Sequence, residues 1–155
     1  MPYDCSQITE NLYVGSLLKK TDAQCVSSKG IRLVISMIFH YPVPAIYGAE
    51  PFESLWLPTF DFPLLPIPIK MLQKGVERAL PLMQSGRPVL VFCRQGRHRS
   101  VAMAAAILIA ENHSSADAMA LLKSGRRVAD PGAFHIKRQI LRFEKHWRKI
   151  SDSQH

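Results

Sequence analysis

Hydrophobic positions along the chain follow two periods, which predict strands and helices in turn. Branched apolar residues fill 31–38 and 88–92 with little polar interruption, as in strands that are buried on both faces of a sheet. Residues 54–57 predict another core strand. The alternation over 8–15 predicts a short strand or hairpin that stops at Gly15. These segments together predict a buried sheet.

Helical spacing of apolar residues separates the predicted strands. We predict helices over 16–28, 69–84, 100–112 and 116–123, and over a final segment that follows the Asp130-Pro131 pair. Prolines rule out regular structure elsewhere: two fall within 41–48, and four lie between 58 and 68 around Asp61. Ser114 and Asp117 form a capping-box-like start for the fourth helix.

Strands that alternate with helices predict an α/β fold. We expect a single domain over residues 1–155, with a central, mostly parallel sheet of about five strands flanked by helices and with the last few residues disordered. No internal repeat, low-complexity tract or linker divides the sequence. At 47% hydrophobic and 21% charged residues, a chain of this length can bury an ordinary core without a disulfide or a structural metal.

Cysteine usage and the terminal segments favour a cytoplasmic protein. Cys5, Cys25 and Cys93 are odd in number and have no CxxC spacing, so they predict neither a disulfide framework nor a zinc site. The N-terminus lacks the features of a signal peptide, and the apolar run 101–110 is too short to cross a bilayer. We expect a monomer without a transmembrane segment, a cofactor or a metal.

The net charge of +8 suggests an anionic substrate or partner. Much of the excess lies in the final helix, where apolar residues from Ile136 to Ile150 recur at helical spacing and basic residues fill the other face. This face is either simply solvated or a docking surface for RNA, anionic lipid or an acidic protein. Its basic residues are Lys137, Arg138, Arg142, Lys145, Arg148 and Lys149.

The segment from Val89 to Ser100 carries the chemistry. A buried strand that ends in a short loop and opens a helix is a general anion-binding device, because backbone N–H groups and the helix N-terminus provide positive potential. A cysteine at the first loop position, Cys93, would have a lowered pKa in this field and would be nucleophilic. Gly96 permits tight curvature, and the loop adds Arg94, Arg97 and Arg99.

Cys93 to Ser100 spells C-x5-R-S, which resembles the signature of the protein tyrosine phosphatase superfamily. The chain as a whole resembles the compact, atypical dual-specificity branch of that superfamily, and the resemblance covers most of the sequence. It implies a dual-specificity phosphatase-like fold and the hydrolysis of phosphomonoesters through a phosphocysteine. The implied substrates are phosphotyrosine, phosphoserine or phosphothreonine in proteins.

The resemblance also implies a role for each site residue. Cys93 would attack phosphorus, and Arg99 would hold two phosphoryl oxygens through its planar fork. Ser100 would hydrogen-bond the sulfur, and Asp61, 32 positions before Cys93, would be the general acid and then the base. Phosphate would be bound by Arg94, Gln95, Gly96, Arg97, His98 and Arg99.

Two departures from the family pattern bear on activity and substrate. Phe92 stands where the family usually has histidine, which bears on how well the thiolate is stabilised. Arg94, Arg97 and His98 resemble residues of phosphoinositide phosphatases and of the inositol-pyrophosphate-cleaving group. They are explained either by a polyphosphorylated substrate (inositol phosphates, phosphoinositides, RNA 5′-phosphates) or by side chains that point outward or brace the Asp61 loop.

Two further functions remain as alternatives. A rhodanese-like sulfurtransferase also places a cysteine in an arginine-rich loop, although its common loop is one residue shorter than the spacing from Cys93 to Arg99. A catalytically weak phosphate-binding module is favoured by Phe92 alone. Four other histidines, His40, His113, His135 and His146, show no metal-ligand spacing.

Overall fold

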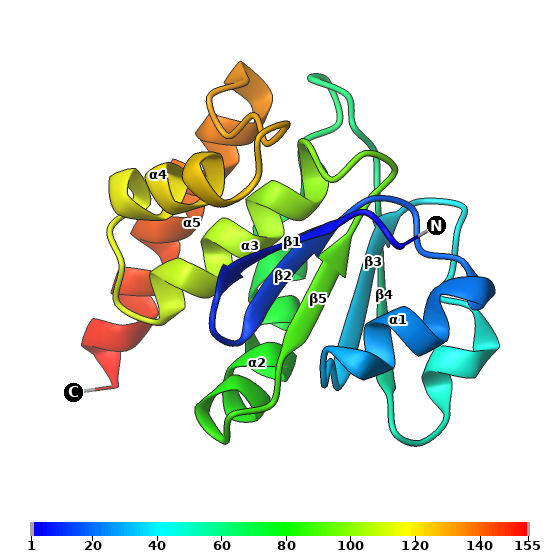
Figure 1. Ribbon diagram of the computed structural model, residues 1–155. Helices are drawn as coiled ribbons and strands as arrows, with labels where there is room; N and C mark the ends of the chain where they lie inside the picture. The colour runs from blue at the N-terminus through cyan, green and yellow to red at the C-terminus, as the bar shows by residue number, and fades with distance from the viewer. Residues whose placement is uncertain (1, 155) are drawn as a thin grey trace.

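Five strands form one sheet in the computed structural model, which describes residues 2–154 (Figure 1). The strands are β1 (Cys5–Thr9), β2 (Leu12–Gly15), β3 (Leu33–Ile38), β4 (Glu53–Thr59) and β5 (Val89–Phe92). Their order is β1-β2-β5-β3-β4, and every neighbouring pair is parallel except the β1-β2 hairpin. The sheet is therefore mixed but mostly parallel, as the sequence predicts.

Burial along the strands explains their composition. Every residue of β3 and β5 is buried, because these strands lie inside the sheet and are covered on both faces. In the edge strand β4, Leu55, Leu57 and Thr59 are buried, whereas Trp56 is exposed. The period of two in β4 thus reflects a strand with one covered face.

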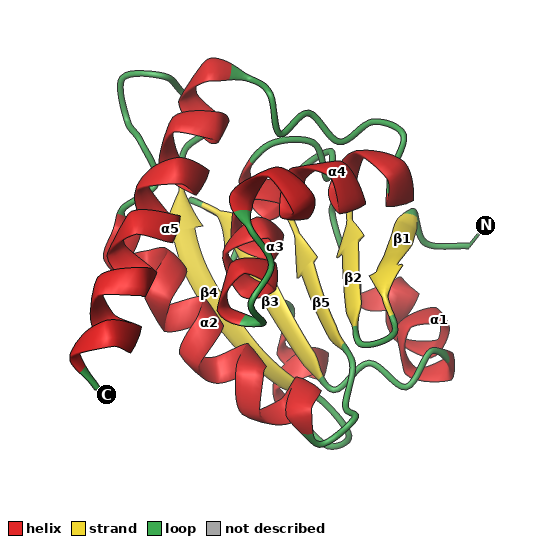
Figure 2. Ribbon diagram, turned by 90° about the vertical axis from the view of Figure 1, so that its left-hand side faces the viewer, coloured by secondary structure: helices red, strands yellow, loops and turns green. Residues whose placement is uncertain are grey.

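Helices cover the sheet unequally. Figures 1 and 2 show α2 to α5 on one face and α1 on the other. Helix α3 lies against the middle of the sheet and is buried along almost its whole length, which explains why its sequence is apolar on every side. The helices are α1 (Ala23–Ser28), α2 (Ile69–Gln84), α3 (Arg99–Ala110), α4 (Ser115–Gly125) and α5 (Phe134–Ser153), with short 3-10 helices η1 (Lys20–Asp22) and η2 (Ala45–Gly48).

The structure corrects two local predictions. The helix predicted over 16–28 begins only at Lys20, because Ser16 N donates to Asp4 O and Leu17 N donates to Arg94 O instead of to helical partners. The predicted loop 41–48 contains the 3-10 helix η2. We expected disorder over the last few residues, but α5 continues to Ser153. His155, which belongs to that expectation, lies outside the described residues.

Two loops meet where the parallel strands end, which is the edge at which open α/β sheets bind ligands. The first, called here the Cys93 loop, covers residues 93–98 between β5 and α3. The second, called here the proline-rich loop, covers residues 60–68 between β4 and α2. Within residues 2–154 no helix has the length and apolar character needed to cross a membrane.

Candidate active site

Backbone geometry in the Cys93 loop depends on Gly96. Its φ is +65°, a left-handed value that favours glycine, and a Cβ there would lie 2.7 Å from the carbonyl oxygen of Gly15. Glycine is thus required both for the backbone conformation and for the close approach of β2. The sequence predicted tight curvature at this position, and the structure adds the reason that no side chain fits.

Arg126 holds the Cys93 loop from behind, a role that sequence reasoning missed. Its side chain is 2% exposed, with Nε donating to Gly96 O at 2.8 Å and Nη2 donating to Gln95 O at 2.9 Å. An ion pair with Asp4 at 3.0 Å balances its charge. Because Arg126 takes up the loop carbonyls on one side, the loop's N–H groups are left to face the other side. No pattern in the sequence distinguishes Arg126 from the other arginines.

Cys93 is 3% exposed and lies at the first position of the loop. Burial alone would raise the pKa of its thiol, but the Ser100 hydroxyl at 3.1 Å, the backbone N–H groups of Ser100 and Arg97, and the Arg99 charge together bring that pKa below its ordinary value. The side chain is therefore poised to be a thiolate without a neighbouring histidine.

Phe92 is the last residue of β5 and comes directly before Cys93. Its side chain is fully buried and packs edge-on against Tyr41, with the ring centroids 6.3 Å apart. The position that usually holds histidine in the resembling family is thus part of the hydrophobic core here. Stabilisation of a Cys93 thiolate falls to Ser100, Arg99 and the loop backbone.

We expect Cys93 to be alkylated by iodoacetamide faster than a free cysteine at neutral pH. A lowered pKa moves the onset of the reaction to lower pH, because the thiolate is the reactive form. Ser100→Ala should move the onset back toward higher pH, since it removes a hydrogen bond to the sulfur. Peptide mass spectrometry over a pH series measures the rate, and the Cys93→Ser chain gives the background from Cys5 and Cys25. A pH profile equal to that of a free thiol would contradict this expectation.

Arg99 is fixed by the ends of two strands. It is 8% exposed, and its Nη1 donates to Thr59 O at 3.1 Å and to Met37 O at 3.4 Å. Its buried Nε has no hydrogen-bond partner among residues 2–154. Because buried guanidinium donors are normally paired, the unpaired side of this planar group is suited to an oxyanion.

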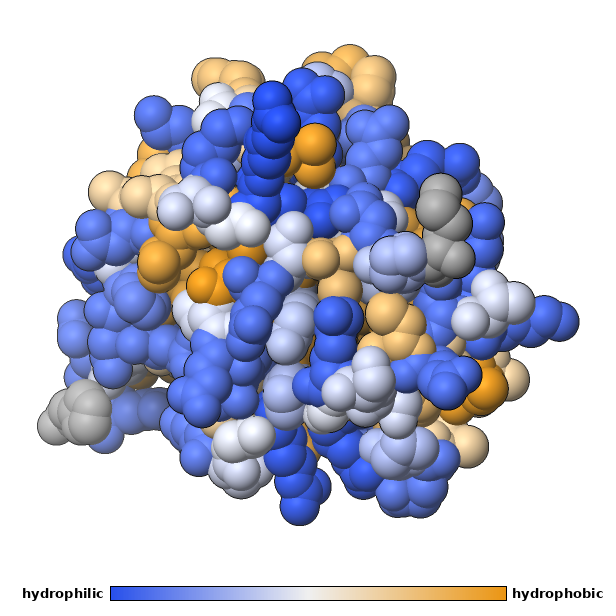
Figure 3. Space-filling model, in the orientation of Figure 1, coloured by the Kyte–Doolittle hydropathy of each residue, from blue (hydrophilic) through white to orange (hydrophobic). Residues whose placement is uncertain are grey.

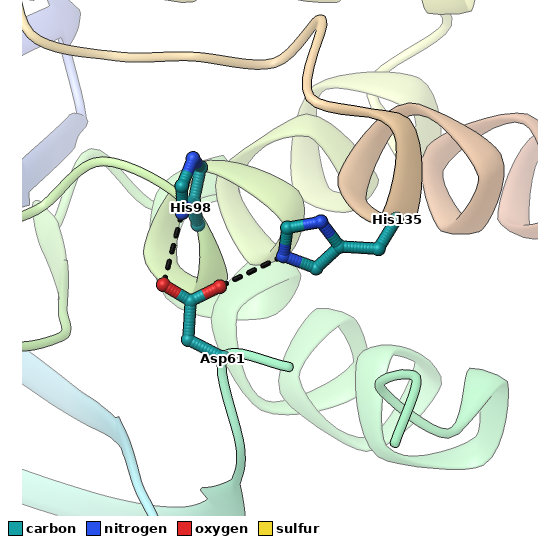
Figure 4. A group of neighbouring side chains, drawn as sticks. All are labelled: Asp61, His98 and His135. Atoms are coloured by element: carbon teal, nitrogen blue, oxygen red, sulfur yellow. Dashed lines mark hydrogen bonds and ion pairs between the residues drawn. The ribbon is translucent and has the colours of Figure 1, made fainter. Parts of the chain in front are cut away.

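Asp61 lies between two histidines (Figure 4). One carboxylate oxygen is 2.9 Å from Nδ1 of His98, and the other is 2.8 Å from Nε2 of His135. Partial burial would raise the pKa of this carboxyl, but the hydrogen bonds from His135 and His98 and the nearby charges of His98 and Arg99 lower it. His135 was missed because it lies 74 residues away in the sequence, in the first turn of α5.

A cavity of about 240 Å³ joins these groups. It is lined by Asp61, Cys93, Arg94, Gln95, Arg97, His98 and Arg99. All the predicted site residues line this cavity except Gly96 and Ser100. Gly96 lies in the loop against Gly15 and Arg126, and Ser100 contacts the sulfur from α3. The ring of His98, which was predicted to bind phosphate, is held between Asp61 and Asp130.

The two additional arginines of the loop differ in how they are held. Arg97 is half exposed and pairs with Asp130 at 3.7 Å, while its carbonyl accepts from Asp130 N at 3.0 Å. Arg94 is exposed and lies 3.4 Å from His40. Both line the cavity, both are exposed to solvent, and their side-chain partners Asp130 and His40 lie outside the proline-rich loop.

Exposed apolar side chains lie on the proline-rich loop that carries Asp61 and at the start of α5. Figure 3 shows hydrophobic side chains in two projections along the upper edge of the molecule, over the start of α5 and over the proline-rich loop. Phe60 stacks on Phe39 with centroids 4.2 Å apart, and both rings are about half exposed. Phe62, Leu64 and Phe134 are also exposed. A substrate that enters the cavity would meet aromatic surface beside Asp61.

Comparison with known proteins agrees with this geometry. Residues 12–146 match the family described as dual specificity phosphatase, catalytic domain. Human phosphatidylglycerophosphatase and protein-tyrosine phosphatase 1 is 34% identical over 110 residues, which are 66% of this chain and 54% of that protein. Mouse dual specificity phosphatase 28 is 27% identical over 131 residues, covering 84% of this chain and 78% of that protein. The chain thus spans about half the length of the first of these relatives.

Solved structures show the same fold. The crystal structure of human DUSP28 superposes with a TM-score of 0.83 at 24% identity, over 96% of this chain and 97% of that one. A crystal structure of PTPMT1 in complex with PI(5)P superposes with a TM-score of 0.80 at 26% identity, over 94% of this chain and 97% of that one. The agreement extends over the sheet, its helices and the loops at the strand ends.

Proposed function

The chain belongs to the dual specificity phosphatase family and is a cysteine-dependent phosphatase, and from this premise we propose that it hydrolyses phosphotyrosine and phosphoserine or phosphothreonine in proteins through a phosphocysteine intermediate. One observation carries the proposal: a thiol with a lowered pKa, a largely buried arginine and a carboxyl group all line one cavity. These are a nucleophile, a phosphate clamp and a proton donor.

In the first step the phosphoryl group lies in the Cys93 loop. Arg99 holds its equatorial oxygens, and the loop N–H groups bind the remaining charge. The Cys93 thiolate attacks phosphorus in line, so that a P–S bond forms as the P–O bond to the substrate breaks. Asp61 must be protonated for this step, although the hydrogen bonds from His135 and His98 lower its pKa in the free enzyme. It gives its proton to the departing oxygen, and the dephosphorylated product leaves as an alcohol or phenol.

In the second step water replaces the product. Asp61, now a carboxylate, takes a proton from water as the oxygen attacks phosphorus. The P–S bond breaks, inorganic phosphate forms, and the electron pair returns to sulfur. The Ser100 hydroxyl, 3.1 Å from the sulfur, stabilises the thiolate that leaves. Each turnover consumes one water and returns Cys93 and Asp61 to their starting protonation states.

Protein substrates are favoured by the surroundings of the cavity. The exposed Phe39 and Phe60 pair next to Asp61 suits an aromatic side chain or an extended peptide. Arg97 is already paired with Asp130, which reduces the positive charge available for a second or third phosphate. The matched relatives include proteins named as dual specificity and tyrosine phosphatases, and also one named for phosphatidylglycerophosphatase activity, so the choice rests on the surroundings of the cavity.

A panel of phosphate-release assays tests the substrate class. It would compare phosphotyrosine and phosphoserine or phosphothreonine peptides with inositol phosphates, phosphoinositides and RNA 5′-phosphates, with the Cys93→Ser chain as the blank. We expect the highest kcat/KM on the peptides. Faster release from inositol phosphates, phosphoinositides or RNA 5′-phosphates would overturn the proposed substrate class, and thiosulfate-dependent sulfur transfer would overturn the reaction.

Asp61→Asn is expected to lower kcat by roughly 10²- to 10⁴-fold on a phosphoserine peptide, because the alkoxide needs the proton that Asp61 supplies. The loss should be smaller on an aryl phosphate with an acidic phenol, which leaves with less protonation. Parallel kcat measurements on both substrates test this difference. Asp152→Asn, an exposed carboxyl at the end of α5, is the matched control and should retain full activity. Equal losses on the two substrates would argue against Asp61 as the acid.

The predicted basic face of α5 is exposed along the helix. Its cationic side chains lie opposite the buried residues Ile136, Ile140 and Phe143. Docking of an anionic partner on this face remains a proposal that we derive from charge alone.

A further inference from the structure

Asp61, His98 and His135 form a cluster of three metal-ligand residues from three separate parts of the fold (Figure 4). Asp61 comes from the proline-rich loop, His98 from the end of the Cys93 loop and His135 from the first turn of α5. Their ligand atoms all lie within 4.8 Å of one another. The proposed phosphatase reaction uses Asp61 but assigns no chemistry to His135, so the second imidazole calls for a separate explanation.

The donor set has the composition of an open zinc site. Two imidazole nitrogens and one carboxylate oxygen, with a fourth position left for water, are a common arrangement around Zn²⁺. Bonds of about 2 Å to a tetrahedral ion hold the donor atoms roughly 3.3 Å apart. Donors that already lie within 4.8 Å of one another can reach this spacing by small side-chain rotations.

The surroundings of His98 supply an independent observation. Nδ1 of His98 faces Asp61, and its other ring nitrogen, Nε2, lies 3.4 Å from the Asp130 carboxylate. A metal-ligating histidine typically donates its second N–H to a carboxylate, which fixes the tautomer and the ring orientation. A proton on Nε2 held by Asp130 would leave the Nδ1 lone pair for a metal ion, which would replace the present hydrogen bond between Nδ1 and Asp61.

Both imidazoles are held in place before any ion binds. The side chains of His98 and His135 are 19% and 17% exposed, and their rings contact edge to face with centroids 5.3 Å apart. Asp61 is more open, with its side chain 36% exposed, so an ion could enter from solvent through the mouth of the cavity. Little ordering of the two histidines would be needed on binding.

We propose that Asp61, His98 and His135 form a binding site for Zn²⁺ and that the bound ion reversibly inhibits the phosphatase. The ion occupies the Asp61 carboxylate, which then has no proton to give to the leaving oxygen. This inhibitory effect rests on the proposed function, because it requires Asp61 as the acid, whereas metal binding itself does not. The site departs from the expectation of no metal, which rested on the spacing of the histidines in the sequence and on a reaction that needs no metal.

Zinc binding is tested without catalysis. Zn²⁺ is titrated into the Cys93→Ser chain, which lacks the reactive thiolate as a competing ligand, against a chromophoric chelator. We expect one equivalent to bind and His135→Ala in the same background to weaken it by at least about tenfold. His113→Ala is the matched control, because His113 follows the far end of α3, a helix about 18 Å long. It should bind zinc as the Cys93→Ser chain does.

A second variant guards against an effect of misfolding. Asp130→Asn leaves all three ligands in place and should weaken zinc binding by roughly 10- to 100-fold, as the loss of a carboxylate that orients a histidine ligand does. Absence of one-equivalent binding to the Cys93→Ser chain would overturn the site. Equal affinity of the His113→Ala and His135→Ala chains would overturn it as well.

Inhibition is measured separately on the active enzyme. Phosphate release by the wild-type chain should fall as buffered free Zn²⁺ rises and should recover when a chelator is added. His135→Ala should require at least about tenfold more Zn²⁺ for the same inhibition. Inhibition of both chains at one zinc concentration would assign the effect to the Cys93 thiolate and overturn the inhibitory role. A wild-type chain that is inactive without zinc would instead refute the proposed function and leave the binding result intact.

Discussion

Cys93→Ser is expected to reduce phosphate release by on the order of 10⁶-fold, as the loss of a nucleophile does in covalent hydrolases. Serine places an oxygen where the sulfur lies, but its hydroxyl stays protonated at neutral pH. The hydrogen bonds and the Arg99 charge that lower the pKa of the thiol cannot make an alkoxide of it. The attack on phosphorus therefore loses its nucleophile while the loop keeps its shape.

Phosphate release from a phosphotyrosine peptide and the binding of the same peptide separate these two effects. The Cys93→Ser chain should be inactive and should still bind the peptide, because Arg99 and the loop backbone remain. Rapid acid quenching of the wild-type chain should trap one phosphoryl group, which peptide mass spectrometry should place on Cys93. Cys25→Ser, a partly buried cysteine in α1, is the matched control and should keep full activity. Residual turnover in Cys93→Ser near the wild-type rate would exclude the phosphocysteine mechanism.

Arg99→Lys is expected to lower kcat/KM by about 10³-fold or more, comparable to the loss of an arginine that stabilises a phosphoryl transition state. Arg99 donates to two strand carbonyls through Nη1 and also lines the cavity. A lysine ammonium has neither the planar fork nor the reach to serve the carbonyls and the cavity at once. The phosphoryl oxygens would lose their two-point contact with the guanidinium group in the transition state.

The same change should also reduce stability. The carbonyl oxygens of Met37 and Thr59 would lose a buried donor, at a cost of about 1–3 kcal/mol in the free energy of unfolding. Thermal unfolding, kcat/KM on a phosphotyrosine peptide and the affinity for inorganic phosphate separate the two effects. Arg138→Lys on the exposed face of α5 is the matched control and should change none of them. A folded Arg99→Lys chain within tenfold of wild-type kcat/KM would contradict the clamp.

Local signals explain the elements that were predicted well. Helix α2 spans Ile69–Gln84 as predicted. Its apolar residues recur at helical spacing over many residues, and Pro68 precedes it while Gly86 follows it. Ser114 caps α4 by accepting from Asp117 N at 3.1 Å, as the sequence suggested. In each case the determinants lie within one or two turns of the residues that they control.

Longer-range contacts explain what was missed. The apolar Leu17 and Leu18 fit a helical pattern, yet the backbone of Leu17 pairs with Arg94, a partner that local periodicity cannot reveal. Arg126 reaches the Cys93 loop from the end of α4, and His135 reaches Asp61 from α5. Each of these contacts depends on how the helices pack on the sheet. A pattern of apolar positions shows which face of a helix is buried, but not which residues of the sheet or its loops that helix contacts.

The Cys93 loop could be predicted from local sequence alone. Its strand, its glycine and its helix are consecutive, and C-x5-R-S brings cysteine and arginine to one loop whatever the rest of the chain does. The surroundings of that loop depend on the tertiary fold. They are the strand ends that bind Arg99, the Arg126 side chain behind Gly96, and the two histidines that contact Asp61. The physical reason is distance along the chain, because these groups meet only after the helices have packed against the sheet.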